Sequence, residues 1–357
     1  MTRAEEVEIK RQKVRTFLDH KSIDGMLLTQ QSNFSWYTAG GSNFVAIASE
    51  AGAAPILVTQ QGDFVIADNI EAPRIVREEI EDLGFEIRSF PWHSPKDLSK
   101  IIKELAGERV ADDTGPLAEE FTRFRYTLTE AEIERYRCLG NDTAESVDEV
   151  CRGLKVGDTE LQIAGRLAES LFPKGIVPIV LLIGVDERIE SFRHPLPTQK
   201  RLKRYAMVVV CARKWGLIVS MTRLVHFGPL PALLRRKHQA VTLVDATFIS
   251  NTKPGAKVAQ IFQRALEAYQ KAGFGDEWGL HHQGGATGYA PREFKATPDS
   301  VEVVLENQAY AWNPSITGTK SEDTIIATRE GPQILTEIKG WPMLNVEGIR
   351  RPDILEL

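Results

Sequence analysis

The sequence predicts two domains of different class, an α/β domain at residues 1–128 and an α+β domain at residues 129–357. Helix-like and β-rich segments alternate in the first third of the chain, a long capped helix follows, and the second half places helices between two sets of strands. Alternating strands and helices are typical of an α/β layer, and separate runs of each are typical of an α+β fold. At 357 residues and 42% hydrophobic content, the chain is long enough for each domain to bury its own core.

The elements of the first domain are indicated by their periodicity. Residues 5–22 carry apolar side chains at helical spacing. Short β-rich runs at residues 24–30, 53–60, 63–69 and 85–90 are separated by turn residues and predict strands.

The second domain begins with a helix whose start is marked by a capping box, Thr129 with Glu132. Gly157 ends this pattern, and a second capped helix is expected from Asp158. Strands are expected at residues 176–184 and 206–228, helices between residues 230 and 272, and a last set of strands around residues 309–318 and 321–331.

Charge and composition exclude several classes of function. The net charge is −5 and basic residues are scattered among acidic ones, so no nucleic-acid footprint is visible. The sequence has no run of about 18 apolar residues that would span a membrane, and its polar start is unlike a signal peptide. We therefore expect a cytoplasmic protein. Three cysteines, Cys138, Cys151 and Cys211, lack CxxC spacing and are expected to be reduced thiols.

The stretch HHQGGATGYAPRE, residues 281–293, does not match a known metal or phosphate motif by itself. A zinc-binding helix needs its histidines one turn apart, whereas His281 and His282 are neighbours and are expected to point apart. A phosphate-binding loop needs a lysine and a hydroxyl residue at a spacing that is absent here.

Landmarks along most of the chain together resemble the pita-bread family of creatinase, prolidase, aminopeptidase P and methionine aminopeptidase. They lie in order along the sequence, which makes the set more specific than any one of them. The landmarks are SNFSWYTAG near the N-terminus, SFRHPLPTQKRL, VVVCARKWGLIVSMTRLVHFG, GLHHQGGATGYAPRE, and WNPSITG with SEDTIIATREG. The resemblance implies a creatinase-type N-terminal α/β domain and a pita-bread C-terminal domain.

Metallopeptidases of this family hold two divalent ions with two Asp, one His and two Glu residues. Carried over position by position, these ligands fall on Val209, Ser220, Gly285, Asn313 and Glu322, and only Glu322 keeps its residue type. The remaining side chains cannot complete the oxygen-rich shell of such ions. The resemblance therefore implies a site that works without a metal and without another cofactor.

The same resemblance suggests the residues of the site. We expect His194, Glu322 and Glu293 to be catalytic, with His194 shuttling a proton between water and a leaving nitrogen. His281, Arg292, Asn313, Ser220 and Arg223 are expected to contact the substrate.

Tyr37 and Phe44 would be pocket walls that reach across a homodimer, or simply core or interface aromatics. Other residues have structural alternatives as well. Glu322 could form an ion pair with Arg223, and Arg292 with Glu293, while His282 is expected to be a packing residue.

The function implied is hydrolysis of a C–N bond, without a metal, in a small amidine, guanidine or N-acyl amino acid. The alternatives are a ligand-binding or scaffold member of the family that lost catalysis, and a degenerate Xaa-Pro peptidase. The expected partners are a small-molecule substrate and a second copy of the chain.

Overall fold

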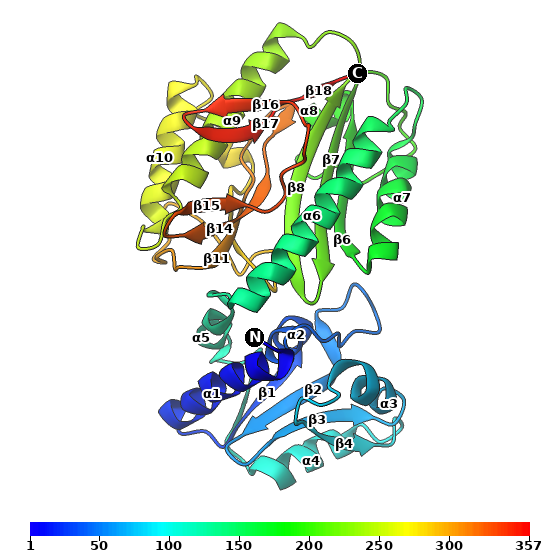
Figure 1. The fold of residues 1–357 in the computed structure, drawn as a ribbon, viewed down its shortest axis with the longest axis vertical. Helices are drawn as coiled ribbons and strands as arrows, with labels where there is room; N and C mark the ends of the chain where they lie inside the picture. Colours follow the sequence, from blue (N-terminus) through cyan, green and yellow to red (C-terminus); the bar gives the residue numbers. More distant parts are fainter. The chain divides into compact units, whose positions relative to one another are not determined.

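The computed structural model describes residues 1–357, which divide into two compact units (Figure 1). The N-terminal unit comprises residues 1–125, 129–132 and 215–217, and the C-terminal unit comprises residues 126–128, 133–214 and 218–357. The first turn of the long helix after Thr129 therefore groups with the N-terminal unit.

The N-terminal unit is the predicted α/β domain. Its five-stranded sheet has the order β4-β3-β2-β1-β5, with β3–β4 and β1–β5 parallel and the other pairs antiparallel. The elements are α1 (Arg3–Lys21), β1 (Gly25–Gln30), α2 (Gln31–Tyr37), β2 (Ala51–Thr59), β3 (Asp63–Asp68), α3 (Ala72–Arg74), the π-helix η1 (Ile75–Glu79), β4 (Glu86–Phe90), α4 (Lys96–Ala106), β5 (Val110–Asp112), α5 (Ala118–Thr122) and the 3-10 turn η2 (Arg123–Arg125).

A buried ion triplet stabilises this unit beside its aromatic core. Lys10 Nζ lies 2.6 Å from a Glu6 oxygen and 2.7 Å from a Glu132 oxygen, and all three side chains are buried. Because Lys10 has two acidic partners, its charge is compensated without water. The triplet ties the first turn of the following helix to α1.

The C-terminal unit is the predicted α+β domain and contains two larger sheets, β18-β8-β7-β6 and β10-β9-β11-β14-β15. Its elements up to the hairpin are α6 (Glu130–Arg152, whose first three residues group with the N-terminal unit), α7 (Glu160–Leu171), the 3-10 turn η3 (Phe172–Lys174), β6 (Val177–Val185), α8 (Glu187–Ser191), β7 (Tyr205–Lys214) and β8 (Leu217–His226). The remaining elements are α9 (Ala232–Asn251), α10 (Val258–Lys271), the 3-10 turn η4 (Glu277–Leu280), β9 (Gly284–Thr287), β10 (Phe294–Lys295), β11 (Gln308–Trp312), β12 (Ser315–Ile316), β13 (Thr319–Lys320), β14 (Asp323–Thr328), β15 (Gly331–Ile334), β16 (Met343–Val346), β17 (Ile349–Pro352) and β18 (Leu355–Glu356).

Each of the two larger sheets is covered by its own pair of helices (Figure 1). Helices α6 and α7 lie beside β6–β8, and α9 and α10 lie beside the sheet that contains β11 and β14. One core cluster joins α9 and α10 to the second sheet, where Phe248 stacks on Trp312 with ring centroids 4.3 Å apart. The helices expected between residues 230 and 272 are therefore present, as α9 and α10.

The helix starts agree closely with the capping signals. Thr129 Oγ1 accepts from Glu132 N at 3.2 Å, and Glu132 Oε2 accepts from Thr129 N at 2.7 Å, so the predicted capping box is confirmed. The second helix begins at Glu160 with Thr159 as its N-cap, because the Thr159 and Gln162 side chains form the reciprocal box there. Asp158, where the sequence predicted the helix to start, lies one residue before this N-cap.

Two composition-based expectations can be compared with the structure. None of the helices is long and apolar enough to cross a membrane. Cys138, Cys151 and Cys211 are free thiols, as their spacing predicted.

Helix α6 lies close at Gly140 to Leu335, the residue after β15, which makes this glycine sensitive to substitution. A Cβ at Gly140 would lie 2.2 Å from the Leu335 carbonyl oxygen, whereas a Cβ at the exposed Gly165 of α7 would meet nothing within 4 Å. We expect Gly140→Ala to lower the free energy of unfolding by about 2 kcal/mol through overpacking. Gly165→Ala should raise it by up to about 1 kcal/mol, because alanine is the better helix former. Denaturant unfolding of both variants tests this, and equal effects would contradict the close approach.

Candidate active site

The C-terminal unit contains a cavity of about 650 Å³. Strands β6 and β7 form one wall, and the polar side chains come from the segments after α8, before β9 and around β10, β11 and β13. The lining residues are Ile179, Val180, Leu181, Leu182, His194, Leu196, Val209, Cys211, His282, Pro291, Arg292, Lys295, Asn313, Lys320 and Glu322. The cavity is therefore apolar on one side and charged on the other.

Glu322 is the buried acidic group of this cavity, and two cations hold it. Lys320 Nζ lies 2.7 Å from Glu322 Oε2, and an Arg292 amino nitrogen lies 3.4 Å from Oε1. The Thr222 hydroxyl donates to Oε2 at 2.7 Å. Burial opposes ionisation, but Lys320 and Arg292 outweigh it and lower the pKa of Glu322. The carboxylate is ionised and its oxygens are already engaged.

The apolar side of the cavity includes two alternate residues of β7, Val209 and Cys211. Behind them, the buried Ser220 hydroxyl of β8 lies 3.2 Å from Cys211 Sγ. Burial raises the pKa of the Cys211 thiol, and the charge of Glu322 raises it further. A protonated buried thiol is neither a nucleophile nor a metal ligand.

Three histidines gather at the edge of the cavity. His281 Nε2 lies 3.0 Å from His194 Nε2, and the ring centroids of His281 and His282 are 4.4 Å apart with an interplanar angle of 31°. The expectation that His281 and His282 point apart is therefore wrong. His281 precedes β9 in an extended conformation, with φ −157° and ψ 146°, and the chain brings both rings to the same side beside His194.

The surroundings keep these imidazoles neutral. Desolvation, followed by Arg292 and Lys320, lowers the pKa of His282 to about 4. Desolvation and Lys320 also lower the pKa of His194, and desolvation, Lys320 and His282 lower that of His281 far below its usual range. Neutral imidazoles have lone pairs that can accept a proton or a metal ion.

Several polar atoms around the cavity are buried without a hydrogen-bond partner. Asn313 Oδ1 is an acceptor of this kind, Arg292 Nε is a donor, and His281 and His282 each leave Nδ1 without a partner. Buried polar atoms are normally satisfied, so a group of such atoms at one cavity indicates where a ligand would bind.

The cavity unites some of the residues predicted from sequence. His194 and Glu322 line it together although 128 positions separate them, and Arg292 and Asn313 line it as well. His281 contacts His194 at its edge. The catalytic or binding roles of these residues stay predictions.

Two of the residues predicted to contact the substrate, Arg223 and Ser220, are buried and bind other groups of the protein. Arg223 is buried, and its guanidinium donates to Asp323 at 2.9 Å and to the Thr336 carbonyl at 2.7 Å, so its assignment as a substrate contact is wrong. Ser220 is fully buried behind Cys211, which corrects its assignment in the same way.

The two aromatic residues predicted as pocket walls lie in the N-terminal unit. Tyr37 is 0% exposed and packs against Trp36 and Phe85, so it belongs to the core rather than to a surface that could reach another copy. Phe44 is partly exposed, and its proposed role stays a prediction.

The ionic partners of Glu322 and Arg292 differ from the two alternatives considered, because these two residues pair with each other. Glu322 pairs with Lys320 and Arg292 rather than with Arg223, whose charge is taken by Asp323. Glu293 also caps its own loop, because its Oε1 accepts from the backbone nitrogens of Tyr289 and Ala290 at 3.0 and 3.2 Å.

Sequence reasoning missed three charged or polar members of the cavity. Lys320 and Lys295 had no counterpart in the family motifs, and His282 was expected to be a packing residue. One signal for Lys320 was present, because it lies two positions before Glu322 and this spacing places both side chains on one face of an extended segment.

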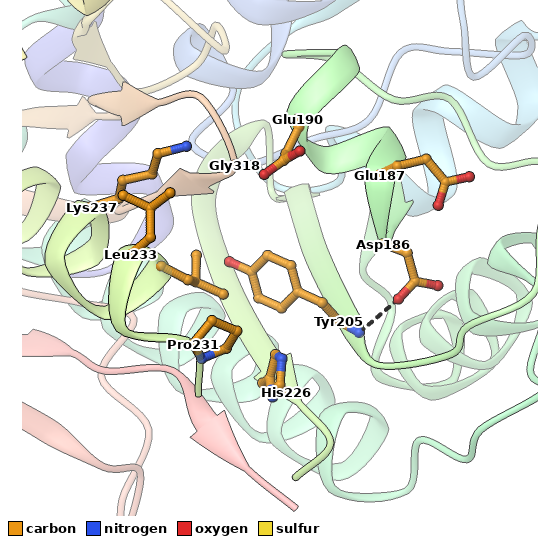
Figure 2. A pocket seen from close by; sticks show the side chains of 10 residues that line it. Asp186, Glu187, Glu190, Tyr205, His226, Pro231, Leu233, Lys237 and Gly318 are labelled. Atoms are coloured by element: carbon orange, nitrogen blue, oxygen red, sulfur yellow. Dashed lines mark hydrogen bonds between the residues drawn. The ribbon is translucent and has the colours of Figure 1, made fainter. Parts of the chain in front are cut away.

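Figure 2 shows a second cavity in the same unit, of about 310 Å³, where Tyr205 faces Leu233 and Pro231. Most of its charged groups are already used within the protein. Asp186 accepts from the backbone nitrogens of residues 203–205, Glu187 pairs with Lys200, and Lys237 donates to the Thr317 carbonyl. The larger cavity is therefore the better candidate.

The fold and the cavity together define a two-domain protein of the creatinase and prolidase type. A model of the creatinase/prolidase N-terminal domain matches residues 10–152, and a model of metallopeptidase family M24 matches residues 134–329. The chain belongs to the M24 metallopeptidase family.

Individual relatives are distant but match over nearly their full lengths. The chain is 22% identical over 360 residues to the uncharacterized peptidase YqhT of Bacillus subtilis, covering 92% of this chain and 98% of that protein. It is 20% identical over 358 residues to the Xaa-Pro dipeptidase of Pyrococcus furiosus, covering 91% and 97%. The prolidase structure from Pyrococcus horikoshii has a TM-score of 0.77 at 18% identity, covering 92% and 98%. These structural similarities support the predicted pita-bread fold.

The pair of divalent ions typical of the family does not fit the donors around Glu322. Its oxygens already bind Lys320, Arg292 and Thr222, and the neighbouring Val209 has no donor atom. Oxygen-rich ligand sets are what such ions need.

The Lys320–Glu322 pair should be strongly coupled because both side chains are buried. We expect Lys320→Met or Glu322→Gln alone to cost about 3 kcal/mol of unfolding free energy, because each leaves a buried charge with fewer partners. The double variant should cost at least about 1 kcal/mol less than the sum. A double-mutant cycle by denaturant unfolding measures this coupling.

The exposed pair Arg329–Glu306, with side chains 75% and 40% exposed, provides the matched control. A cycle with Arg329→Met and Glu306→Gln should give a coupling below about 1 kcal/mol. Equal coupling in the two cycles would contradict the special role of the buried pair.

Proposed function

We propose that this M24 family member binds a small amide with a free carboxylate, such as an N-acyl amino acid or a dipeptide, and does so without the family's pair of divalent ions. The single observation that carries the proposal is the charge of the cavity. Lys320, Arg292 and Lys295 line it, and Glu322 is the one acidic side chain among the lining residues. A cavity with excess positive charge favours an anionic ligand.

This charge distribution selects among the substrate classes that the sequence suggested. An amidine or guanidinium cation would face three like charges, and the carboxylate that could attract it is already held by Lys320 and Arg292. An N-acyl amino acid places a carboxylate among these cations instead. The names of the relatives, which include Xaa-Pro dipeptidases, agree with a small peptide-like ligand.

The unpartnered polar atoms fit an amide in the same way. Asn313 Oδ1 can accept from the amide N–H of an N-acyl amino acid or from the terminal amino group of an Xaa-Pro dipeptide, and Arg292 Nε can donate to the ligand's carboxylate. Both atoms are buried, so a hydrogen bond from the ligand would remove a desolvation cost of about 1–3 kcal/mol for each. The apolar wall of β6 leaves room for an aliphatic or proline side chain.

Hydrolysis of this ligand is the second candidate function, and the His194–His281 contact favours it. His194 is the candidate proton acceptor of this pair, because the pKa of His281 lies far below its usual range and its ring stays neutral as a hydrogen-bond partner of His194. Glu322, whose oxygens are occupied, would act only through electrostatics. Our first proposal is therefore that the protein binds this amide without hydrolysing it.

A homodimer also remains part of the proposal. Val45 and Ile47, which follow the partly exposed Phe44, are 69% and 45% exposed. An exposed apolar segment of this kind is consistent with a contact between copies.

Ligand class can be tested by titrating the purified protein with glycyl-proline, its C-terminal amide, and benzamidine. We expect the free acid to raise the thermal midpoint in a concentration-dependent manner and the other two compounds to leave it unchanged. Arg292→Gln should weaken binding of the acid by about ten- to a hundredfold, because a charge-assisted hydrogen bond is lost.

Arg264→Gln on α10 is the matched control, since Arg264 is absent from the cavity lining. Equal binding of acid and amide, or preferential binding of benzamidine, would overturn the proposal. An affinity that does not change in Arg292→Gln would place the ligand elsewhere.

Turnover can be measured separately by quantifying free proline in the same mixtures. If the chain is a hydrolase, His194→Ala should lower turnover by about a hundredfold or more, the usual scale for a general acid–base residue. Unchanged turnover in this variant would exclude His194 from catalysis. Binding without any release of proline would identify a ligand-binding protein.

A further inference from the structure

The three-histidine cluster at the edge of the cavity has a geometry that the binding of a carboxylate does not explain. We propose that His194, His281 and His282 form a binding site for a single transition-metal ion, with Zn²⁺ as the reference ion. Each of these residues offers a ligand atom, and the three atoms lie within 4.8 Å of one another. The proposal is independent of the proposed function, and its ligand set contains none of the positions matched to the family's metal ligands.

The separations are close to those that a tetrahedral ion requires. At a Zn–N distance of about 2.0–2.1 Å, two ligand nitrogens lie roughly 3.4 Å apart. His281 Nε2 and His194 Nε2 are 3.0 Å apart, so they need to separate by only a few tenths of an ångström. All three separations are at most 4.8 Å, so the remaining nitrogen has to move inward by at most about 1.4 Å to reach such an ion. His194 can supply this movement, because it is exposed and lies outside any helix or strand.

The hydrogen bonding of the cluster also leaves room for a metal. His281 and His282 each have an Nδ1 atom that is buried and has no partner. A histidine that serves only to pack a loop normally satisfies its ring nitrogens. His282 Nδ1 is therefore available to an ion, whereas His281 Nδ1 would keep no partner when His281 binds through Nε2.

The positive charges nearby are compensated in part, and a net positive charge remains because Lys320 and Arg292 share one carboxylate and Lys295 also lines the cavity. Lys320 and Arg292 are paired with Glu322, and Arg193 is paired with Glu277 at 2.6 Å. An additional cation at the cluster is therefore opposed less than the number of basic residues suggests. A fourth ligand that is anionic, such as hydroxide or a carboxylate, would reduce this opposition further.

The ligand type selects the metal. Three imidazoles suit Zn²⁺, Co²⁺, Ni²⁺ or Cu²⁺, whereas Mg²⁺ and Mn²⁺ prefer oxygen ligands. Three protein ligands also leave a fourth position open, which is the arrangement of catalytic rather than structural zinc sites. The ion would thus be accessible from the cavity.

The experiment uses the untagged full-length protein, treated with a chelator and then returned to metal-free buffer. We expect Zn²⁺ to bind at one site per chain with a dissociation constant of about 10 μM or lower in calorimetry. Co²⁺ should give the intense visible bands of a tetrahedral complex, and Mn²⁺ should bind at least about tenfold more weakly. His282→Ala and His194→Ala should each weaken Zn²⁺ binding by at least about tenfold.

His93→Ala, at an exposed histidine of the N-terminal unit, should leave Zn²⁺ binding unchanged. Because alanine variants can perturb the loop, His282→Gln provides a second test at similar volume, and thermal midpoints without metal verify folding. No saturable Zn²⁺ binding, or binding unaffected by changes at His194 and His282, would overturn the proposal. Since metal binding is measured without the amide ligand, this result is separate from the test of ligand class.

Discussion

A buried network of four charges in the C-terminal unit determines where the cavity can form. Arg223 lies 2.9 Å from one oxygen of Asp323, and Arg351 lies 2.8 Å from the other. Arg351 also lies 2.6 Å from Asp245 on α9. Loss of one partner of a buried ion pair commonly costs about 3–5 kcal/mol, because an uncompensated charge remains. The network therefore fixes the start of β14 against β8, β17 and α9.

Glu322 is the residue immediately before Asp323, and this position gives the two carboxylates opposite roles. Successive side chains of an extended segment point to opposite faces. Asp323 points into the arginine network, and Glu322 points into the cavity, where Lys320 and Arg292 meet it. The rigidity that the network gives to Asp323 is thus transmitted to Glu322 through one peptide unit. This explains why the Glu322 carboxylate has a defined position, although its partners Lys320 and Arg292 come from separate segments of the chain.

The sequence contained enough information to predict the fold, because local signals and packing agree. The Thr129 capping box and the helices expected between residues 230 and 272 both correspond to observed elements. The site was less predictable, since its contacts depend on which side of a strand each residue faces in three dimensions. The family motif predicted Arg223 to contact the substrate, but its guanidinium donates hydrogen bonds to Asp323 and to the Thr336 carbonyl. The direction of the His282 ring also depends on long-range packing beside His194.

The cavity combines fixed positive charges with neutral nitrogen donors, and both can act on the same ligand. Lys320 and Arg292 provide fixed cations on one side, and the histidine cluster provides nitrogen donors on the other, with each side acting electrostatically on the other. A metal ion at the histidines would increase the attraction for a carboxylate, and a bound carboxylate would decrease the repulsion that the metal experiences. Such coupling is reciprocal by thermodynamic necessity, so each ligand would strengthen the binding of the other by the same factor. The excess positive charge, which taken alone opposes a metal, therefore becomes a reason for metal and carboxylate to bind together.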